Sequence, residues 1–80
     1  MNVLIVDDEP LARERLSRMV SELEGYTVLE PSATNGEEAL ALIDSHKPDI
    51  VLIDIRMPGL DGLQVAARLC ERETPPAVVF

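Results

Sequence analysis

The 80-residue sequence is poor in basic residues. Seven Lys and Arg residues against fifteen Asp and Glu residues leave a net charge of −8. This segment therefore lacks the basic stripe with which proteins neutralise the phosphates of nucleic acids. Its acidic surplus instead favours cations, or partners that present positive charge.

Cysteine and long apolar runs are also scarce. A single cysteine forms no disulfide within the chain, which agrees with a reducing cytosol. This cysteine, Cys70, falls on an apolar helix position, where we expect a buried, unreactive thiol. No apolar run reaches the length of a membrane span. Met1 leads directly into a strand-like segment, so we expect no secretory signal, no membrane association and a cytoplasmic location.

Short apolar segments alternate with amphipathic ones along the chain. The segments with strand character are residues 2–7, 26–33, 50–53 and 77–80. Helices are expected from Pro10 to Gly25, from the capping sequence Asn35-Gly36-Glu37-Glu38 to His46-Lys47-Pro48, and from Asp61-Gly62-Leu63-Gln64 to Pro75-Pro76. The apolar helix positions are expected to be buried: Ala12, Leu16, Met19, Val20 and Leu23; Ala39, Leu40 and Ile43; Leu63, Ala66, Ala67, Leu69 and Cys70.

This alternation predicts a doubly wound α/β fold. Parallel strands are joined by right-handed crossovers, and helices cover both faces of the sheet. Pro31 has no N–H group for a strand ladder, which places residues 26–33 at an edge of the sheet. The expected strand order is then 2-1-3-4, and the order reverses between the first and third strands.

Carboxylates follow both strands that flank this reversal. Asp7 and Asp8 come at the end of the first strand, and Asp54 comes at the end of the third. Because the carboxyl ends of neighbouring parallel strands meet at one edge of the sheet, we expect the three acids to share a crevice. Three like charges repel, so either one acid is protonated or a divalent cation lies among them. Oxygen ligands without a His or Cys cluster favour Mg²⁺ over zinc.

The three acids are expected to have different roles. Asp54, a single acid that follows four apolar residues, is the predicted nucleophile toward a phosphoryl group. Asp8 is the predicted direct metal ligand, and Asp7 assists through water. A simpler interpretation is that Asp54 ends a strand and Asp8 caps a helix. His46, a lone histidine at a helix end, is expected to be a surface residue.

The segments VDDEP, ATNGEEAL and LIDIRMPGLDG, in this order, resemble the receiver domain of two-component response regulators, and most closely the LytR/AlgR group. The resemblance covers all 80 residues and implies a flavodoxin-like (CheY-like) sheet. It implies that Asp54 is the phosphoacceptor, charged by a sensor histidine kinase, a phosphotransfer protein or a small acyl phosphate. It also implies that Mg²⁺ is held by Asp8, Asp54 and the backbone carbonyl of Arg56, with Asp7 assisting.

The same resemblance implies partners. The kinase would dock on the first helix, around Leu11, Arg13 and Glu14, and a DNA-binding output domain would lie outside this chain. Phosphorylation would change a homodimer surface of the receiver. The guanidinium of Arg56 either steers incoming phosphate or points to water.

Two elements of the family pattern are missing up to Phe80: a Ser or Thr after the fourth strand and a Lys after the fifth. We therefore expect residues 1–80 to form a receiver domain that is incomplete at its C-terminus and lacks the fifth strand. Alone, it should bind Mg²⁺ weakly and accept phosphate poorly. Its unprotected fourth strand predicts an oligomer or a domain swap, unless these residues are part of a longer protein, which we favour.

Two other functions fit less of the sequence. A phosphohydrolase of the haloacid dehalogenase type also uses an aspartyl nucleophile and Mg²⁺, but it needs a second Asp where this sequence has Arg56, so we expect no enzyme. A receiver-like interaction module that works without phosphate has no need of the trio Asp7, Asp8 and Asp54.

Overall fold

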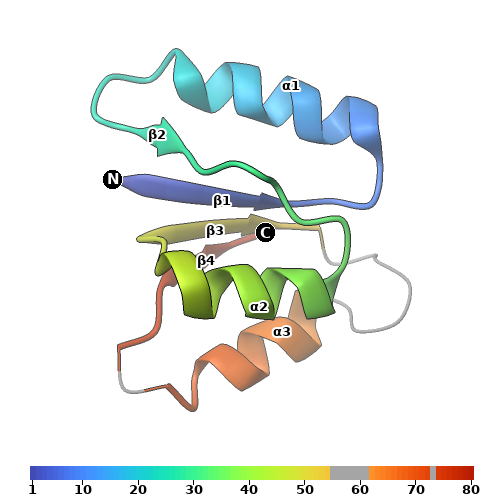
Figure 1. The fold of residues 1–80 in the computed structure, drawn as a ribbon, viewed down its shortest axis with the longest axis vertical. Helices are drawn as coiled ribbons and strands as arrows, with labels where there is room; N and C mark the ends of the chain where they lie inside the picture. Colours follow the sequence, from blue (N-terminus) through green and yellow to red (C-terminus); the bar gives the residue numbers. More distant parts are fainter. Residues whose placement is uncertain (55–61, 73) are drawn as a thin grey trace.

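The computed structural model describes residues 1–54, 62–72 and 74–80. Strands and helices alternate within these ranges. In chain order they are β1 (Asn2–Val6), α1 (Pro10–Ser21), β2 (Thr27–Val28), α2 (Gly36–His46), β3 (Ile50–Ile53), α3 (Gly62–Leu69) and β4 (Ala77–Val79). The sheet forms the middle layer, with α1 on one side and α2 and α3 on the other (Figure 1). This confirms the predicted α/β layering.

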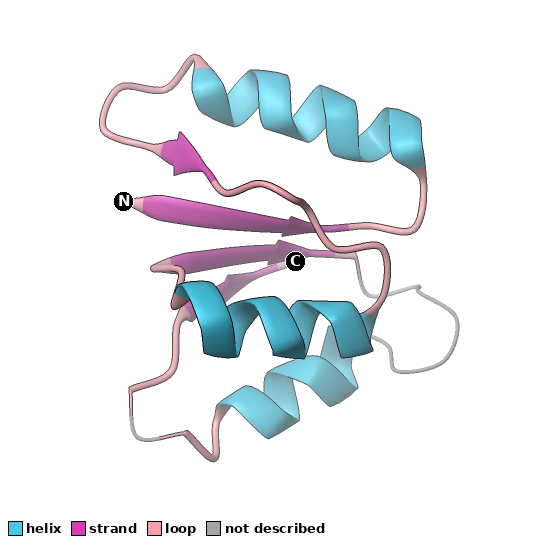
Figure 2. Cartoon of the chain, viewed as in Figure 1, coloured by secondary structure: helices cyan, strands magenta, loops and turns pink. Residues whose placement is uncertain are grey.

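The strands form a parallel sheet in the order β2-β1-β3-β4, as predicted. All strand arrows point toward the same edge of the sheet (Figure 2). β1 and β3 pair in the centre, from Val3 opposite Ile50 to Val6 opposite Ile53. β2 lies at the edge but is shorter than predicted, because Pro31 interrupts the ladder between Val28 and an isolated bridge that joins Ala33 to Val6.

The core is divided between the two faces of the sheet. Because side chains alternate along a strand, Leu4 and Val6 point to the face covered by α2 and α3, whereas Val3 and Ile5 point to the face covered by α1. All four are buried. This two-sided burial is why β1 has an unbroken apolar sequence, and it fixes the position of the residues that follow the strand.

The buried face of α1 is narrower than the sequence predicted. Val20 is buried and Leu16 packs partly against the same cluster, but Met19 and Leu23 are exposed. Leu16 and Val20 are four residues apart and share one helix face, whereas Met19 lies about 100° away from Val20 around the helix. Leu23 follows the end of the helix, and Gly25 comes later still, in the turn before β2, with a φ of 88° that suits glycine.

The buried face of α3 also differs from the prediction. Val65 and Leu69 are buried and lie four residues apart, whereas Leu63 is 59% exposed on the opposite side of the helix. Cys70 follows the helix and is exposed, so the expected buried thiol is wrong. Ala67 is exposed as well, and Ala66 is partly buried. The predicted cap, Asp61, lies outside the described residues.

The boundaries of α2 agree with the sequence. Asn35 caps the helix, and its side-chain oxygen accepts a hydrogen bond from the Glu38 amide at 2.8 Å. Ala39 and Ile43 are buried, and Leu40 is partly buried. His46, at the end of the helix, is exposed as predicted.

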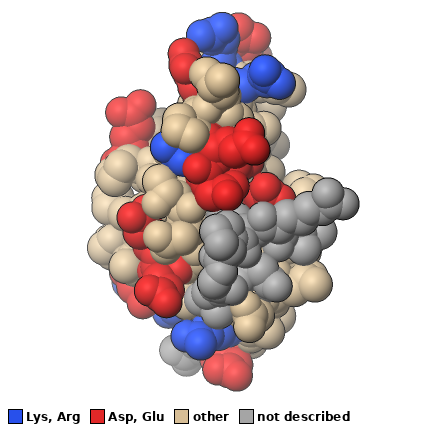
Figure 3. Space-filling view, turned by 90° about the vertical axis from the view of Figure 1, so that its right-hand side faces the viewer, with Lys and Arg blue, Asp and Glu red and all other residues tan. Residues whose placement is uncertain are grey.

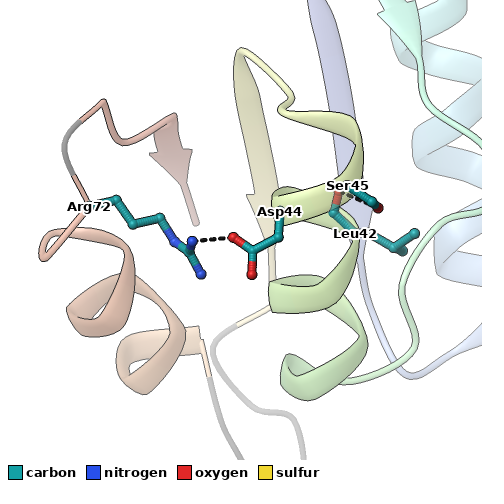
Figure 4. A network of polar contacts seen from close by, with 4 residues as sticks. All are labelled: Leu42, Asp44, Ser45 and Arg72. Carbon is teal, nitrogen blue, oxygen red and sulfur yellow. Dashed lines mark hydrogen bonds and ion pairs between the residues drawn. The ribbon is translucent and has the colours of Figure 1, made fainter.

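An ion pair at the surface joins the two helices on one face of the sheet. Asp44 of α2 pairs with Arg72, which follows α3, and Ser45 donates a hydrogen bond to the Leu42 carbonyl nearby (Figure 4). Such partly exposed pairs add little to stability, so the packing of α2 against α3 depends mainly on buried apolar residues.

The outer strand β4 leaves Val79 and the following Phe80 exposed. These residues are the physical basis for the expected association through this edge, which stays a prediction. No helix in the described part of the chain combines the length and the hydropathy needed to cross a membrane.

Candidate functional site

The predicted acids meet at the carboxyl edge of the sheet. Val6 and Ile53 are opposite each other in the central strand pair, and the Asp54 amide donates a hydrogen bond to the Val6 carbonyl at 3.1 Å. One carboxylate oxygen from each of Asp7, Asp8 and Asp54 lies within 4.8 Å of the other two. Figure 3 shows this edge, where acidic side chains gather near the centre of the face. The three residues that the sequence placed in one crevice are therefore together.

Asp7 is the most buried of the three acids, and several hydrogen bonds hold it in place. It is only 9% exposed, and its amide donates to the Ala33 carbonyl at 3.0 Å. Its carboxylate oxygen Oδ1 accepts from the Glu9 amide at 2.9 Å, and its carbonyl oxygen accepts from Arg13 Nη1 at 2.8 Å. These bonds fix both the backbone and the side chain of Asp7.

Asp8 has a different environment from its neighbour. It is exposed, and its carboxylate makes no hydrogen bond within the described ranges. Glu9, not Asp8, occupies the N-cap position of α1, and Glu9 makes no side-chain capping bond. The simpler interpretation of Asp8 as a helix cap is therefore wrong. In the described structure the Asp8 carboxylate is therefore available as a ligand beside Asp7 and Asp54.

The donor set fits a hard divalent cation. Two oxygens on opposite sides of an octahedral Mg²⁺ are about 4.2 Å apart, because each Mg–O distance is about 2.1 Å. Oxygens within 4.8 Å of one another thus need only small side-chain movements to share an ion directly or through water. The Arg56 carbonyl, which the resemblance adds to this set, lies outside the described residues.

A second polar group lies at the start of α2 and was only partly predicted. The Glu38 carboxylate does not return to the Asn35 amide, as a simple capping box would have it. Instead Oε1 accepts from the Thr34 amide at 2.9 Å and from Thr34 Oγ1 at 2.8 Å. These two bonds, and to a smaller degree the charge of Arg13, lower the pKa of Glu38 below its usual range. The capping pattern located Glu38, but no sequence signal indicated its bonds to Thr34.

Replacing Thr34 by Val is expected to raise the pKa of Glu38 toward its usual range, because the hydroxyl donor is lost while the amide donor remains. A group whose pKa is lowered on folding stabilises the fold above its unfolded pKa, and this stabilisation is lost as the pH falls through the folded pKa. The variant should therefore be less stable than the parent at neutral pH and equal to it in acid. Carboxyl carbon NMR shifts measured against pH give the titration directly.

Thr27→Val is the matched control for this titration. Thr27 lies in β2 and makes no side-chain bond to Glu38 in the described structure, so the control should leave the Glu38 titration unchanged. An unaltered titration in Thr34→Val would show that the hydroxyl bond contributes nothing.

The fold and the acidic group together define a class of protein. Four parallel strands in this order, with acids after β1 and β3, are the architecture in which ligands bind at the switch point of the sheet. Residues 3–80 match the family model of the response regulator receiver domain, and the chain belongs to this family.

One relative in particular agrees with the LytR/AlgR resemblance. The chain is 85% identical over 80 residues to the positive alginate biosynthesis regulatory protein of Pseudomonas aeruginosa, covering all of this chain and 32% of that protein. The chain thus spans about a third of the length of this relative.

Solved structures agree with the fold. The receiver domain of the regulator NarL from Mycobacterium tuberculosis is 43% identical, with a TM-score of 0.87 over 96% of this chain and 61% of that chain. The regulator TrrA of Thermotoga maritima, solved with Mg²⁺ and BeF, is 42% identical, with a TM-score of 0.85 over 96% of this chain and 64% of that chain. TrrA was also solved in complex with the histidine kinase ThkA.

Proposed function

We propose that this receiver domain accepts a phosphoryl group on Asp54 in a Mg²⁺-dependent reaction. One observation carries the proposal: carboxylate oxygens from the ends of two different strands, β1 and β3, lie within 4.8 Å of one another. Such a group of like charges is costly unless it is neutralised. The regulator TrrA, 42% identical, was solved with Mg²⁺ and BeF, which supports the proposal.

Asp8 and Asp54 would hold the ion directly and Asp7 would assist through water, with the Arg56 carbonyl as a further proposed ligand. When bound, Mg²⁺ supplies positive charge that offsets repulsion between the carboxylates and the oxygens of a phosphoryl group. An oxygen of Asp54 forms a bond to phosphorus while the bond from phosphorus to the donor's leaving atom breaks, and the donor keeps that electron pair.

The proposed donor in the cell is a sensor histidine kinase. The start of α1 offers an exposed docking surface, with Leu11 73% exposed and Glu14 one turn further on. An apolar side chain this exposed is available to a partner. Arg13 fits the contact less well than the sequence suggested, because its guanidinium already donates to the Asp7 carbonyl. The complex of TrrA with a histidine kinase supports this choice of partner.

The proposed output is control of transcription in the cytoplasm through a DNA-binding domain outside this chain, with a homodimer as the switched state. These 80 residues carry a net charge of −8 and would repel DNA phosphates, so the proposal assigns the DNA contacts to a different domain. A relative from Mycobacterium tuberculosis that is 44% identical, and of which this chain spans 37%, is named as a transcriptional regulatory protein, which supports this division of roles.

The test is to treat the full-length protein with acetyl phosphate and to measure its intact mass with and without Mg²⁺. We expect one phosphoryl adduct that needs Mg²⁺. Asp8→Asn should raise the Mg²⁺ concentration for half-maximal labelling by about 100-fold or more, since even the outer partners of metal ligands contribute 10–100-fold to affinity.

Glu9→Gln is the matched control for the Asp8 variant. It removes the same charge one residue further along, from an exposed side chain outside the acidic group. The control should label at the wild-type Mg²⁺ concentration. Equal shifts in both variants would show that Asp8 contributes only general charge. A wild-type protein without any adduct would favour the alternative, an interaction module that works without phosphate.

A further inference from the structure

Arg13 connects the first turn of α1 to the end of β1. Its Nη1 atom donates a hydrogen bond of 2.8 Å to the carbonyl oxygen of Asp7, in partly buried surroundings. The Asp7 amide also donates to the Ala33 carbonyl, and the Asp7 carboxylate accepts from the Glu9 amide, so Arg13 adds a third bond that holds Asp7. Arg13 thus binds the backbone of Asp7, one of the three acids of the candidate metal site.

Apart from the bond between the Glu9 amide and the Asp7 carboxylate, few side-chain bonds restrain the described turn that Arg13 contacts. Glu9 caps α1 without a side-chain bond, and Pro10 at the start of the helix has no N–H to offer. Asp8 lies within this turn and is exposed, so the backbone of the turn sets where its side chain starts. Within the described ranges, the Arg13 side chain reaches from α1 to the strand end, alongside the bond from the Glu9 amide at the N-cap to the Asp7 carboxylate.

Arg13 also lines a surface pocket together with Ser32 and Thr34, which lie in the loop that leads into α2. The charge of Arg13 acts on Glu38 at the start of α2, and the Glu38 carboxylate is anchored by Thr34. Thr34 follows Ala33, which pairs with β1 through Val6 and Asp7. The guanidinium is therefore placed between the end of β1 and the loop that leads into α2. The bond from Arg13 to the Asp7 carbonyl therefore links the turn to a side chain that lies against this loop.

We propose that Arg13 is a positioning residue that holds the β1–α1 turn so that Asp7 and Asp8 face Asp54 in the arrangement that Mg²⁺ requires. This inference rests on the proposed Mg²⁺ site. It is distinct from the expected role of Arg13 as a kinase contact, because it concerns the protein without its kinase.

Two effects of removing Arg13 have opposite signs, which makes the proposal testable. A cation near three carboxylates repels Mg²⁺, so loss of its charge alone would tighten Mg²⁺ binding. Loss of the bond to Asp7 makes the turn more mobile before Mg²⁺ binds. Binding must then order the ligands, and this cost in free energy weakens the Mg²⁺ affinity. The direction of the change in Kd separates a positioning role from a purely electrostatic one.

The experiment titrates the full-length protein with MgCl₂ by calorimetry. For Arg13→Ala we expect the Mg²⁺ Kd to rise about tenfold, the lower end of the effect of outer partners at metal sites. At saturating Mg²⁺, labelling by acetyl phosphate should return to near the wild-type rate, because Arg13 does not touch the reacting atoms. A damaged fold would lower that labelling rate as well. A raised Mg²⁺ Kd with a near wild-type labelling rate therefore identifies a positioning role.

Arg18→Ala is the matched control, since Arg18 lies on the same helix and its exposed guanidinium pairs with Glu14 instead of the acidic group. Its Mg²⁺ Kd should equal that of the wild type. Arg13→Lys keeps the charge and one donor group and should give an intermediate Kd, and this variant replaces Arg13→Ala if the latter does not fold.

A lower or unchanged Kd in Arg13→Ala, with wild-type binding intact, would overturn the positioning role alone. Should the wild-type protein bind no Mg²⁺ at all, the proposed function fails, and the role of Arg13 fails with it.

Discussion

Asp54→Asn in the full-length protein is expected to carry no phosphoryl group after treatment with acetyl phosphate and Mg²⁺. The amide is close to the carboxylate in shape but lacks the negative oxygen that attacks phosphorus. The backbone bond from the Asp54 amide to Val6 does not involve the side chain, so the end of β3 should stay in place. Intact mass spectrometry measures the loss of the adduct.

Asp49→Asn controls for the removal of a negative charge at the other end of the same strand. The Asp49 carboxylate is exposed and accepts a hydrogen bond from the Asn2 amide at 2.7 Å, which an asparagine oxygen also accepts. The control should be labelled like the wild type. An adduct that persists in Asp54→Asn would place the acceptor on another residue.

Leu69→Ala is expected to destabilise the domain by about 2–5 kcal/mol, the usual cost of a leucine-sized cavity in a core. Leu69 is 1% exposed and packs in the cluster between α2, α3 and the central strands. The loss is a large part of the stability of a small domain. Hydrogen exchange of the buried amides of β1 and β3 in the full-length protein measures it.

Leu63→Ala is the matched control on the same helix. Leu63 is 59% exposed, so its truncation should change the free energy of unfolding by less than about 0.5 kcal/mol. Similar losses in the two variants would mean that α3 buries a different face from the one in the structure.

The sheet and the acidic site were predictable because each depends on a strong local pattern. Residues 3–6 of β1 and all of β3 are apolar and are followed directly by acids, and Pro31 places β2 at the edge. Once the strand order is known, parallel pairing brings the strand ends together without further information. Neither step requires knowledge of individual side-chain contacts.

The helix faces were predicted less well, because several helix positions are apolar without being buried. Leu63 and Met19 fit a helical stripe in the sequence, but the sheet covers only the faces that carry Val65 and Val20. Which apolar residues face the sheet depends on how each helix is rotated on it, and tertiary packing sets this rotation.

The contacts of Arg13 and Thr34 had no sequence signal. Arg13 binds a backbone carbonyl, an acceptor that every residue offers, so residue types do not identify the pair. Thr34 lies before the predicted cap at Asn35, and its bonds to Glu38 extend the capping motif by one residue. Such contacts follow from the path of the chain in three dimensions.

The burial of Asp7 beside the exposed Asp8 affects how loss-of-function variants of this acidic pair are interpreted. A substitution of Asp7 also breaks the anchor for the Glu9 amide, so reduced phosphate uptake in such a variant mixes misfolding with lost chemistry. Asp8 has no comparable hydrogen bond in the described chain, so a defect there would isolate the contribution of the proposed ion. Of these two neighbouring aspartates, the exposed Asp8 is therefore the better position at which to test the proposed ion by mutation.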